Sequence, residues 1–109
     1  MSHQVRILAR AQEDFEALVA WISERSPQGA ERWVASFEVA LSKLENNPFI
    51  QPMASESKEL GEEVRNVMFR TKAGRTYRAL FVVVGDEVRI LRVRGSGQPP
   101  VTREDIGRE

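Results

Sequence analysis

Eight cationic side chains lie between residues 64 and 94, and only Asp86 and Glu87 balance them there. All but one are arginines, whose planar guanidinium groups recognise phosphate and carboxylate through paired hydrogen bonds. Taken singly, each is explained by solubility and by protection of strand edges, but the excess of the set indicates a surface that binds an anion or an acidic partner. The set consists of Arg65, Arg70, Lys72, Arg75, Arg78, Arg89, Arg92 and Arg94.

Arg78 is the member of this set that most needs a partner. It stands between Tyr77 and the apolar run at 79–84, where an unpaired charge is costly. We therefore expect either a carboxylate of the protein or a phosphate of a ligand beside it.

Other kinds of chemistry have few candidates in this sequence. The chain has no cysteine and a single histidine, His3, so disulfides, thiol catalysis and a cysteine-based metal site are excluded and imidazole chemistry is almost so. We expect no metal and no cofactor. The glycines at 95–97 match no complete phosphate-loop pattern and indicate a flexible turn. Trp21 lies slightly off the apolar stripe of its predicted helix, where it could mark a contact surface.

The charge is distributed unevenly along a chain whose formal net charge is zero. Residues 1–63 hold 6 basic and 11 acidic side chains, whereas residues 64–109 hold 10 basic and 5 acidic ones. A length of 109 residues suits one domain, 1–109, with one core. The first ten residues lack the apolar core of a signal peptide, and no apolar run is long enough to cross a bilayer, so we expect a cytoplasmic protein without membrane contact.

The elements that must position the cations begin with a strand and two helices. Apolar residues alternate over 4–9, which predicts a strand, and from Glu13 to about Arg25 they recur at helical spacing behind acidic residues in the first turn. Ser26 and Pro27 are typical of a helix start, and a second helix is predicted until 46–48. Residues 49–63 show no clear period and are predicted to be a loop.

Three strands follow, at 64–70, 75–84 and 87–94, and the turn at Gly85 and Asp86 predicts a two-residue hairpin. The expected register pairs Val84 with Glu87, Phe81 with Ile90, Leu80 with Leu91 and Arg78 with Val93. One face then carries Tyr77, Ala79, Phe81, Val83, Val88, Ile90, Arg92 and Arg94, and the other, open face carries Arg78, Leu80, Val82, Arg89, Leu91 and Val93. We expect the helices to cover the aromatic face. Residues 102–105 fit a capping box of a short final helix. The predicted fold is α+β, a small antiparallel sheet with an N-terminal helical hairpin on one face, in the order β-α-α-β-β-β.

The helix pair with SP.GAERWVASFEVALSKLENNP, followed by VRNVMF and G.TYRALFVV.GDEVRILRVRG, resembles the RelE/ParE superfamily of toxins from bacterial type II toxin-antitoxin systems, which includes proteins described as plasmid stabilisation proteins. The resemblance spans essentially the whole chain and implies the same fold as the periodicity does. It further implies neutralisation by a co-encoded antitoxin, and contact with operator DNA through that complex.

Two activities divide this superfamily, and the resemblance leaves both open. One branch cuts mRNA on the ribosome with basic residues of the sheet and a His or Tyr near the C-terminus; Arg65 and Arg78 match its basic strand positions, but residues 95–109 contain neither His nor Tyr. The other branch poisons DNA gyrase, requires no such residue, and is our first hypothesis. The alternatives are an endoribonuclease that works mainly through arginine electrostatics, and a non-toxic homologue that only binds its antitoxin.

Overall fold

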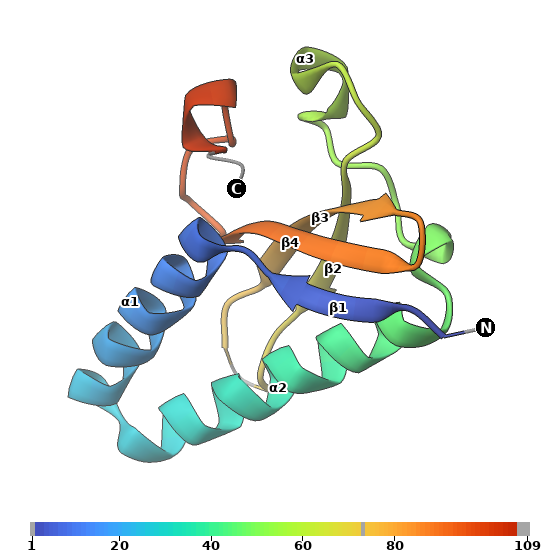
Figure 1. Ribbon diagram of the computed structural model, residues 1–109. Helices are drawn as coiled ribbons and strands as arrows, with labels where there is room; N and C mark the ends of the chain where they lie inside the picture. The colour runs from blue at the N-terminus through green and yellow to red at the C-terminus, as the bar shows by residue number, and fades with distance from the viewer. Residues whose placement is uncertain (1, 73, 107–109) are drawn as a thin grey trace.

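The computed structural model describes residues 2–72 and 74–106, and its elements follow the predicted order β-α-α-β-β-β (Figure 1). Short turns of helix interrupt the segment between the second helix and the second strand, and another follows the last strand. The main elements are β1 (Gln4–Ile7), α1 (Ala9–Arg25), α2 (Pro27–Asn46), β2 (Arg65–Phe69), β3 (Tyr77–Val84) and β4 (Glu87–Gly95); the short ones are η1 (Pro48–Ile50), α3 (Ser57–Leu60) and η2 (Arg103–Asp105).

The helix α1 starts one turn earlier than predicted. Leu8 precedes its first residue, is buried, and donates its backbone N–H to the carbonyl of Ile90, so the chain turns directly from β1 into the helix. The predicted first-turn acids at 13 and 14 therefore lie in the second turn, and the first turn holds none. This shift brings Asp14 to the end of β4, where it has a structural role described below.

The start of α2 is as predicted. The Ser26 hydroxyl accepts a hydrogen bond from the Gly29 N–H at 2.9 Å, and Pro27 occupies the first turn, where its missing N–H costs nothing. Trp33, Phe37 and Leu44 on this helix are buried against the sheet.

The four strands form one sheet in the order β1-β4-β3-β2. The three C-terminal strands are antiparallel, as predicted, whereas β1 joins the edge of β4 in parallel, so the whole sheet is mixed. The long excursion through α1 and α2 permits this pairing, because parallel neighbours need a crossover rather than a tight turn.

The β3–β4 hairpin starts in the predicted register and then departs from it. Gly85 has φ +59° and no described non-glycine residue has positive φ, which agrees with a type II′ turn. The pairs Val84–Glu87 and Phe81–Ile90 are confirmed, but the next pair is Leu80–Arg92 because Leu91 is the extra residue of a bulge.

The bulge makes the predicted faces wrong beyond Leu91. Arg78 pairs with Arg94 rather than Val93, and Ala79 pairs with Val93. Residues opposite each other in a ladder share a face, so Arg92 and Arg94 lie on the face of Arg78, and Val93 joins the core beneath the helices. This arrangement buries a valine in place of two charges.

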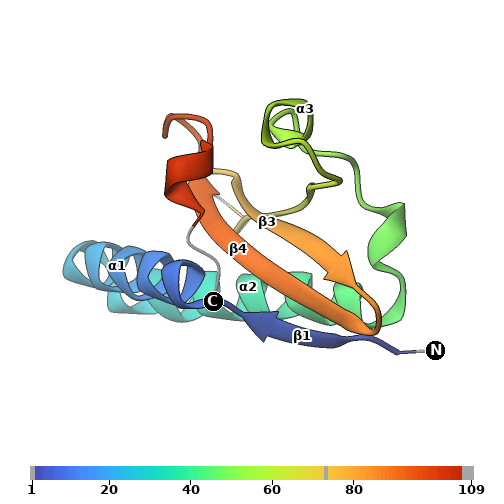
Figure 2. The same ribbon diagram turned by 45° about the horizontal axis from the view of Figure 1, so that its top comes forward.

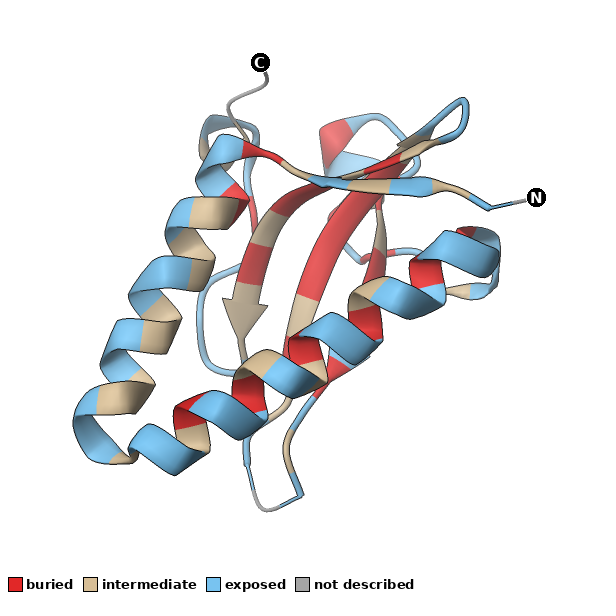
Figure 3. Cartoon of the chain, turned by 60° about the horizontal axis from the view of Figure 1, so that its bottom comes forward, coloured by how far each residue is buried: buried red, intermediate tan, exposed pale blue. Residues whose placement is uncertain are grey.

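Helices α1 and α2 cover the aromatic face of the sheet, as predicted (Figure 3). The opposite face, which was expected to be open, is partly covered by α3 and η2 (Figure 2). A second, smaller core forms there, and the loop predicted at 49–63 is ordered by it. Its members are Leu8, Ala54, Leu60, Val64, Leu80, Val82, Leu91 and Val101, with Ile106 packed against them.

Two further features concern the described residues as a whole. The capping box between Thr102 and Asp105 is present and starts the single 3₁₀ turn η2, shorter than the helix expected. None of the helices formed by the described residues combines the length and the apolarity needed to cross a membrane.

Candidate functional site on the sheet and the basic hairpin

The eight predicted cations do not form one surface. Arg78, Arg89, Arg92 and Arg94 lie on the sheet face opposite the helices, Arg65 lies on the helix side, and Arg70, Lys72 and Arg75 lie in the connection between β2 and β3. The three groups have different partners, and the difference decides what each can do.

Arg78 has the carboxylate partner that its apolar neighbours require. Its guanidinium donates two parallel hydrogen bonds to Glu56, the one from Nη1 to Oε1 being 2.8 Å, and Nη1 also donates to Asn66 Oδ1 at 2.9 Å. Glu56 is only 3 % exposed, and the Arg78 side chain is 22 % exposed. Arg78 is therefore largely neutralised within the fold, and the predicted alternative of a ligand phosphate is not needed to explain it.

Glu56 also fixes the C-terminal segment. Its Oε2 accepts the backbone N–H of Val101 at 3.0 Å, so one buried carboxylate joins the 52–60 segment, β3 and the chain after β4. The hydrogen bonds from Arg78, opposed by burial and helped by the Val101 N–H, lower the pKa of Glu56 from 4.5 to about 2. It is thus ionised at neutral pH.

Arg92 is held by Asp14 of α1. Its Nε and Nη2 donate to the two carboxylate oxygens at 2.7 and 2.9 Å, and Nη1 donates to the carbonyl of Asp105 at 2.6 Å. Asp14 also accepts the Val93 N–H at 2.9 Å, which satisfies a backbone donor beside the bulge. These hydrogen bonds from the side chain to Asp14 raise the pKa of Arg92 above its ordinary value.

The two remaining arginines of this face are also paired. Arg94 Nη2 lies 3.3 Å from Asp105 Oδ2, and Arg89 Nε lies 2.5 Å from Glu87 Oε1. The hydrogen bond from Arg89 lowers the pKa of Glu87, and the Thr102 N–H lowers that of Asp105. Each of the four arginines on this face therefore has a carboxylate from the same chain.

Arg65 does not accompany Arg78, although both match basic strand positions of the ribonuclease branch. Arg65 pairs with Phe81 in the ladder and Arg78 pairs with Met68, which places them on opposite faces. Arg65 Nη1 donates to the carbonyls of Phe49 and Gln51 at 3.2 and 2.8 Å. Its role is to hold the η1 segment against the sheet.

The cations in the connection between β2 and β3, which we call the hairpin cations, are the accessible part of the predicted set. Arg70, Lys72 and Arg75 are exposed, and within residues 2–72 and 74–106 none of them forms a salt bridge. Beside them, a groove of about 520 Å³ runs between α2 and β2. Its lining includes Val39, Ala40 and Lys43 of α2, Met68 and Phe69 of β2, and Arg70.

Among the described residues, neither the tyrosine nor the histidine lies beside the paired arginines. Tyr77, the single tyrosine, is buried on the helix side of the sheet between Trp33 and Phe69. His3 lies against Phe49, beside η1. Among the described residues, no group of three His, Cys, Asp or Glu side chains could hold a metal ion.

Sequence reasoning missed Asp14 and Glu56, the two acids that neutralise the central arginines. Asp14 was interpreted as a helix-start acid, and Glu56 lay in the predicted loop. The sequence did indicate that Arg78 needs a carboxylate partner, but it did not identify which of the sixteen acidic residues that partner is.

The comparison with known families agrees with the fold and with the resemblance stated above. Residues 5–100 match the family model described as ParE toxin of type II toxin-antitoxin system, parDE. A similarity search of the curated proteins finds no match.

Proposed function

Because the chain belongs to the ParE toxin family of type II toxin-antitoxin systems, we propose that it stops bacterial growth by poisoning DNA gyrase and that a co-encoded antitoxin neutralises it. What supports a protein target over RNA cleavage is the pairing of the sheet arginines. Arg78, Arg92 and Arg94 contact Glu56, Asp14 and Asp105, so their charge is largely cancelled before any ligand arrives. Gyrase as the target would place the site of action in the cytoplasm.

Ribonuclease chemistry has two requirements that this face does not favour. A pentacovalent phosphorane needs uncompensated cations around it, and proton transfer needs a group that titrates near neutral pH. Arginine titrates far above neutrality, and its hydrogen bonds to Asp14 move the pKa of Arg92 further upward. These are reasons to rank mRNA cleavage second.

The experiment is induction of the chain in bacteria, with colony survival, mRNA integrity and plasmid supercoiling measured from the same cultures. We expect at least a tenfold loss of colonies with intact mRNA and altered supercoiling or broken DNA. Fragmented mRNA with normal supercoiling would support the ribonuclease instead. Survival of cells that accumulate the folded chain would support the non-toxic homologue.

The antitoxin, in this proposal, occupies the groove between α2 and β2 with an acidic extended segment. The first part of the β2 edge is paired, because the Asn66 N–H donates to Pro52 and Ala54 N–H to Val64. Residues two apart in a strand point their N–H groups to the same side, so the N–H of Met68 points away from β3, as that of Asn66 does. No described strand lies beside Met68 on that side. An added strand would pair there, and Lys43 and Arg70 would meet its acidic side chains. Any contact with operator DNA would be made by the resulting complex.

Met68→Asp is expected to weaken the complex with the cognate antitoxin at least tenfold, because it puts a negative charge into this groove. Val84→Asp is the matched control, since Val84 is about as exposed as Met68 but lies at the β3–β4 turn. Isothermal titration calorimetry with both variants measures the effect. Equal affinities of Met68→Asp and wild type would exclude this site for the antitoxin.

A further inference from the structure

One exposed aromatic residue is left unexplained by the fold. Trp21 is 48 % exposed, whereas Trp33, the other tryptophan, is 2 % exposed and lies in the core beneath the sheet. Contact between water and the apolar surface of an indole does not stabilise the fold, and a polar residue would suit an exposed position better. Its position at the end of α1 therefore calls for another reason.

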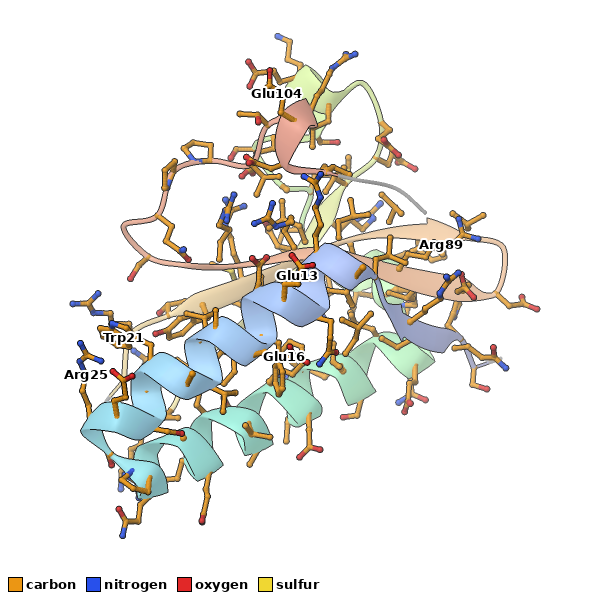
Figure 4. All side chains as sticks on the ribbon, turned by 60° about the vertical axis from the view of Figure 1, so that its left-hand side comes forward. Glu13, Glu16, Trp21, Arg25, Arg89 and Glu104 are labelled. Atoms are coloured by element: carbon orange, nitrogen blue, oxygen red, sulfur yellow. The ribbon has the colours of Figure 1, made fainter. Side chains whose placement is uncertain are left out.

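A guanidinium covers part of this indole. The Arg25 Cζ lies 3.7 Å from the centre of the Trp21 ring, and Arg25 Nη1 donates to the carbonyl of Trp21 at 2.8 Å. Figure 4 shows both side chains together near the C-terminal end of α1, far from Arg89. The cation–π contact and the hydrogen bond hold the guanidinium of Arg25 over the Trp21 ring, so the two side chains present one joint surface to a partner.

A hollow adjoins this pair. It has a volume of about 210 Å³ and lies where α1 meets the start of β3 and the chain leaving β4. Its lining includes Leu18, Trp21, Arg75, Tyr77, Ser96 and Gln98. Two aromatic rings, two polar side chains and a guanidinium thus line a space of the size of one side chain.

The charge at this end of the molecule is positive and available. Among the described residues, Arg25 forms a salt bridge only with Glu24, which is 3.9 Å away and highly exposed, and Arg75 forms none. This contrasts with the four sheet arginines, each of which has a carboxylate within 3.3 Å.

We propose that Trp21, Arg25 and Arg75, with the hollow beside them, form the surface by which the toxin docks on an acidic patch of its protein target. Tryptophan and arginine are enriched among the residues that carry most of the binding energy in protein interfaces, where they pack into pockets from which water is excluded. The inference rests on the proposed function, because it assigns to that function the contact surface on the toxin. It separates this surface from the groove between α2 and β2, which is left to the antitoxin.

A protein partner fits these residues better than single-stranded nucleic acid. A base stacks on a free aromatic face, but Arg25 already occupies one face of Trp21. Two cations neutralise only about two phosphates, which gives weak binding at physiological salt. An acidic protein surface needs only these two charges and a side chain that enters the hollow.

The test uses Trp21→Ala and Arg75→Glu, each with a control that removes the same property elsewhere. Ile50→Ala removes another exposed apolar side chain, and Lys58→Glu reverses another exposed charge, on α3. For each variant we would measure the unfolding temperature, killing on induction, and the Kd for purified gyrase and for the cognate antitoxin. We expect Trp21→Ala and Arg75→Glu to bind gyrase on the order of 30-fold more weakly and to kill poorly, with antitoxin affinity and unfolding temperature nearly unchanged. Both controls should kill like wild type.

The outcomes separate this inference from the proposed function. If wild type kills without binding gyrase, the proposed target is wrong, and loss of killing in the two variants but not the controls still supports the docking surface. Killing by both variants at the wild-type level overturns it, and so does a wild type that does not kill. Binding of a single-stranded 20-nucleotide DNA by wild type that both variants lose would assign the surface to nucleic acid and overturn the protein partner.

Discussion

Replacing Glu56 by glutamine is expected to lower the free energy of unfolding by about 3 kcal/mol, the size expected when one partner of a buried ion pair is removed. The substitution keeps the shape of the side chain but leaves Arg78 without a charged partner. One of the two acceptor oxygens becomes an NH2 donor, so at least one of the hydrogen bonds from Arg78 and the Val101 N–H is lost. Urea unfolding measures the loss. Glu59→Gln is the control, because Glu59 is an exposed carboxylate of α3, the short helix that Glu56 precedes, and it should change stability by less than about 0.5 kcal/mol.

Because of the same carboxylate, we expect the free energy of unfolding to fall at acidic pH. Its pKa is about 2 in the folded chain against 4.5 when unperturbed, so the unfolded chain binds the proton more readily. The stabilisation is therefore complete above about pH 4.5 and is lost as the pH falls toward 2, by about 3 kcal/mol in total. Glu56→Gln should flatten that part of the curve. An equally steep fall of the unfolding free energy in the variant would mean that other carboxylates cause it.

Asp14→Ala is expected to cost about 2 to 3 kcal/mol, because Asp14 is the acceptor for three donors. Arg92 loses both side-chain hydrogen bonds to it, and the Val93 N–H is left without an acceptor beside the bulge. Glu13→Ala removes the neighbouring, exposed carboxylate and is the matched control. Urea unfolding gives the cost, and hydrogen exchange of the Val93 amide shows where it arises. Equal stability of the two variants would mean that Asp14 does not hold the bulge.

The local signals in the sequence predicted the parts of the fold that depend on neighbouring residues. Ser26 and Pro27 start α2 as expected, and Gly85 starts the hairpin in the expected register. The bulge at Leu91 was not predictable in this way, because it depends on which residues the two cores can bury. The early start of α1 likewise depends on Leu8 packing in the second core.

The candidate site was predicted only in part, for a similar reason. The sequence identified the cations and the need of Arg78 for an acid, but Glu56 is 22 positions away from Arg78 and Asp14 is 78 positions away from Arg92. Such pairs form through tertiary contacts that no local pattern encodes. The connection between β2 and β3 extends beyond the sheet, and therefore its three cations, Arg70, Lys72 and Arg75, stay accessible. Five of the eight predicted cations therefore have partners within the chain, whereas Arg70, Lys72 and Arg75 form no salt bridge among the described residues.

The most direct test of the gyrase proposal is supercoiling of relaxed plasmid by purified DNA gyrase, with the purified chain added alone and then with its antitoxin. We predict that the chain alone blocks supercoiling or accumulates cleaved plasmid, and that the antitoxin reverses this. Normal supercoiling at an excess of folded chain over gyrase, together with cleavage of mRNA on ribosomes by the same preparation, would contradict the proposal and identify a ribonuclease.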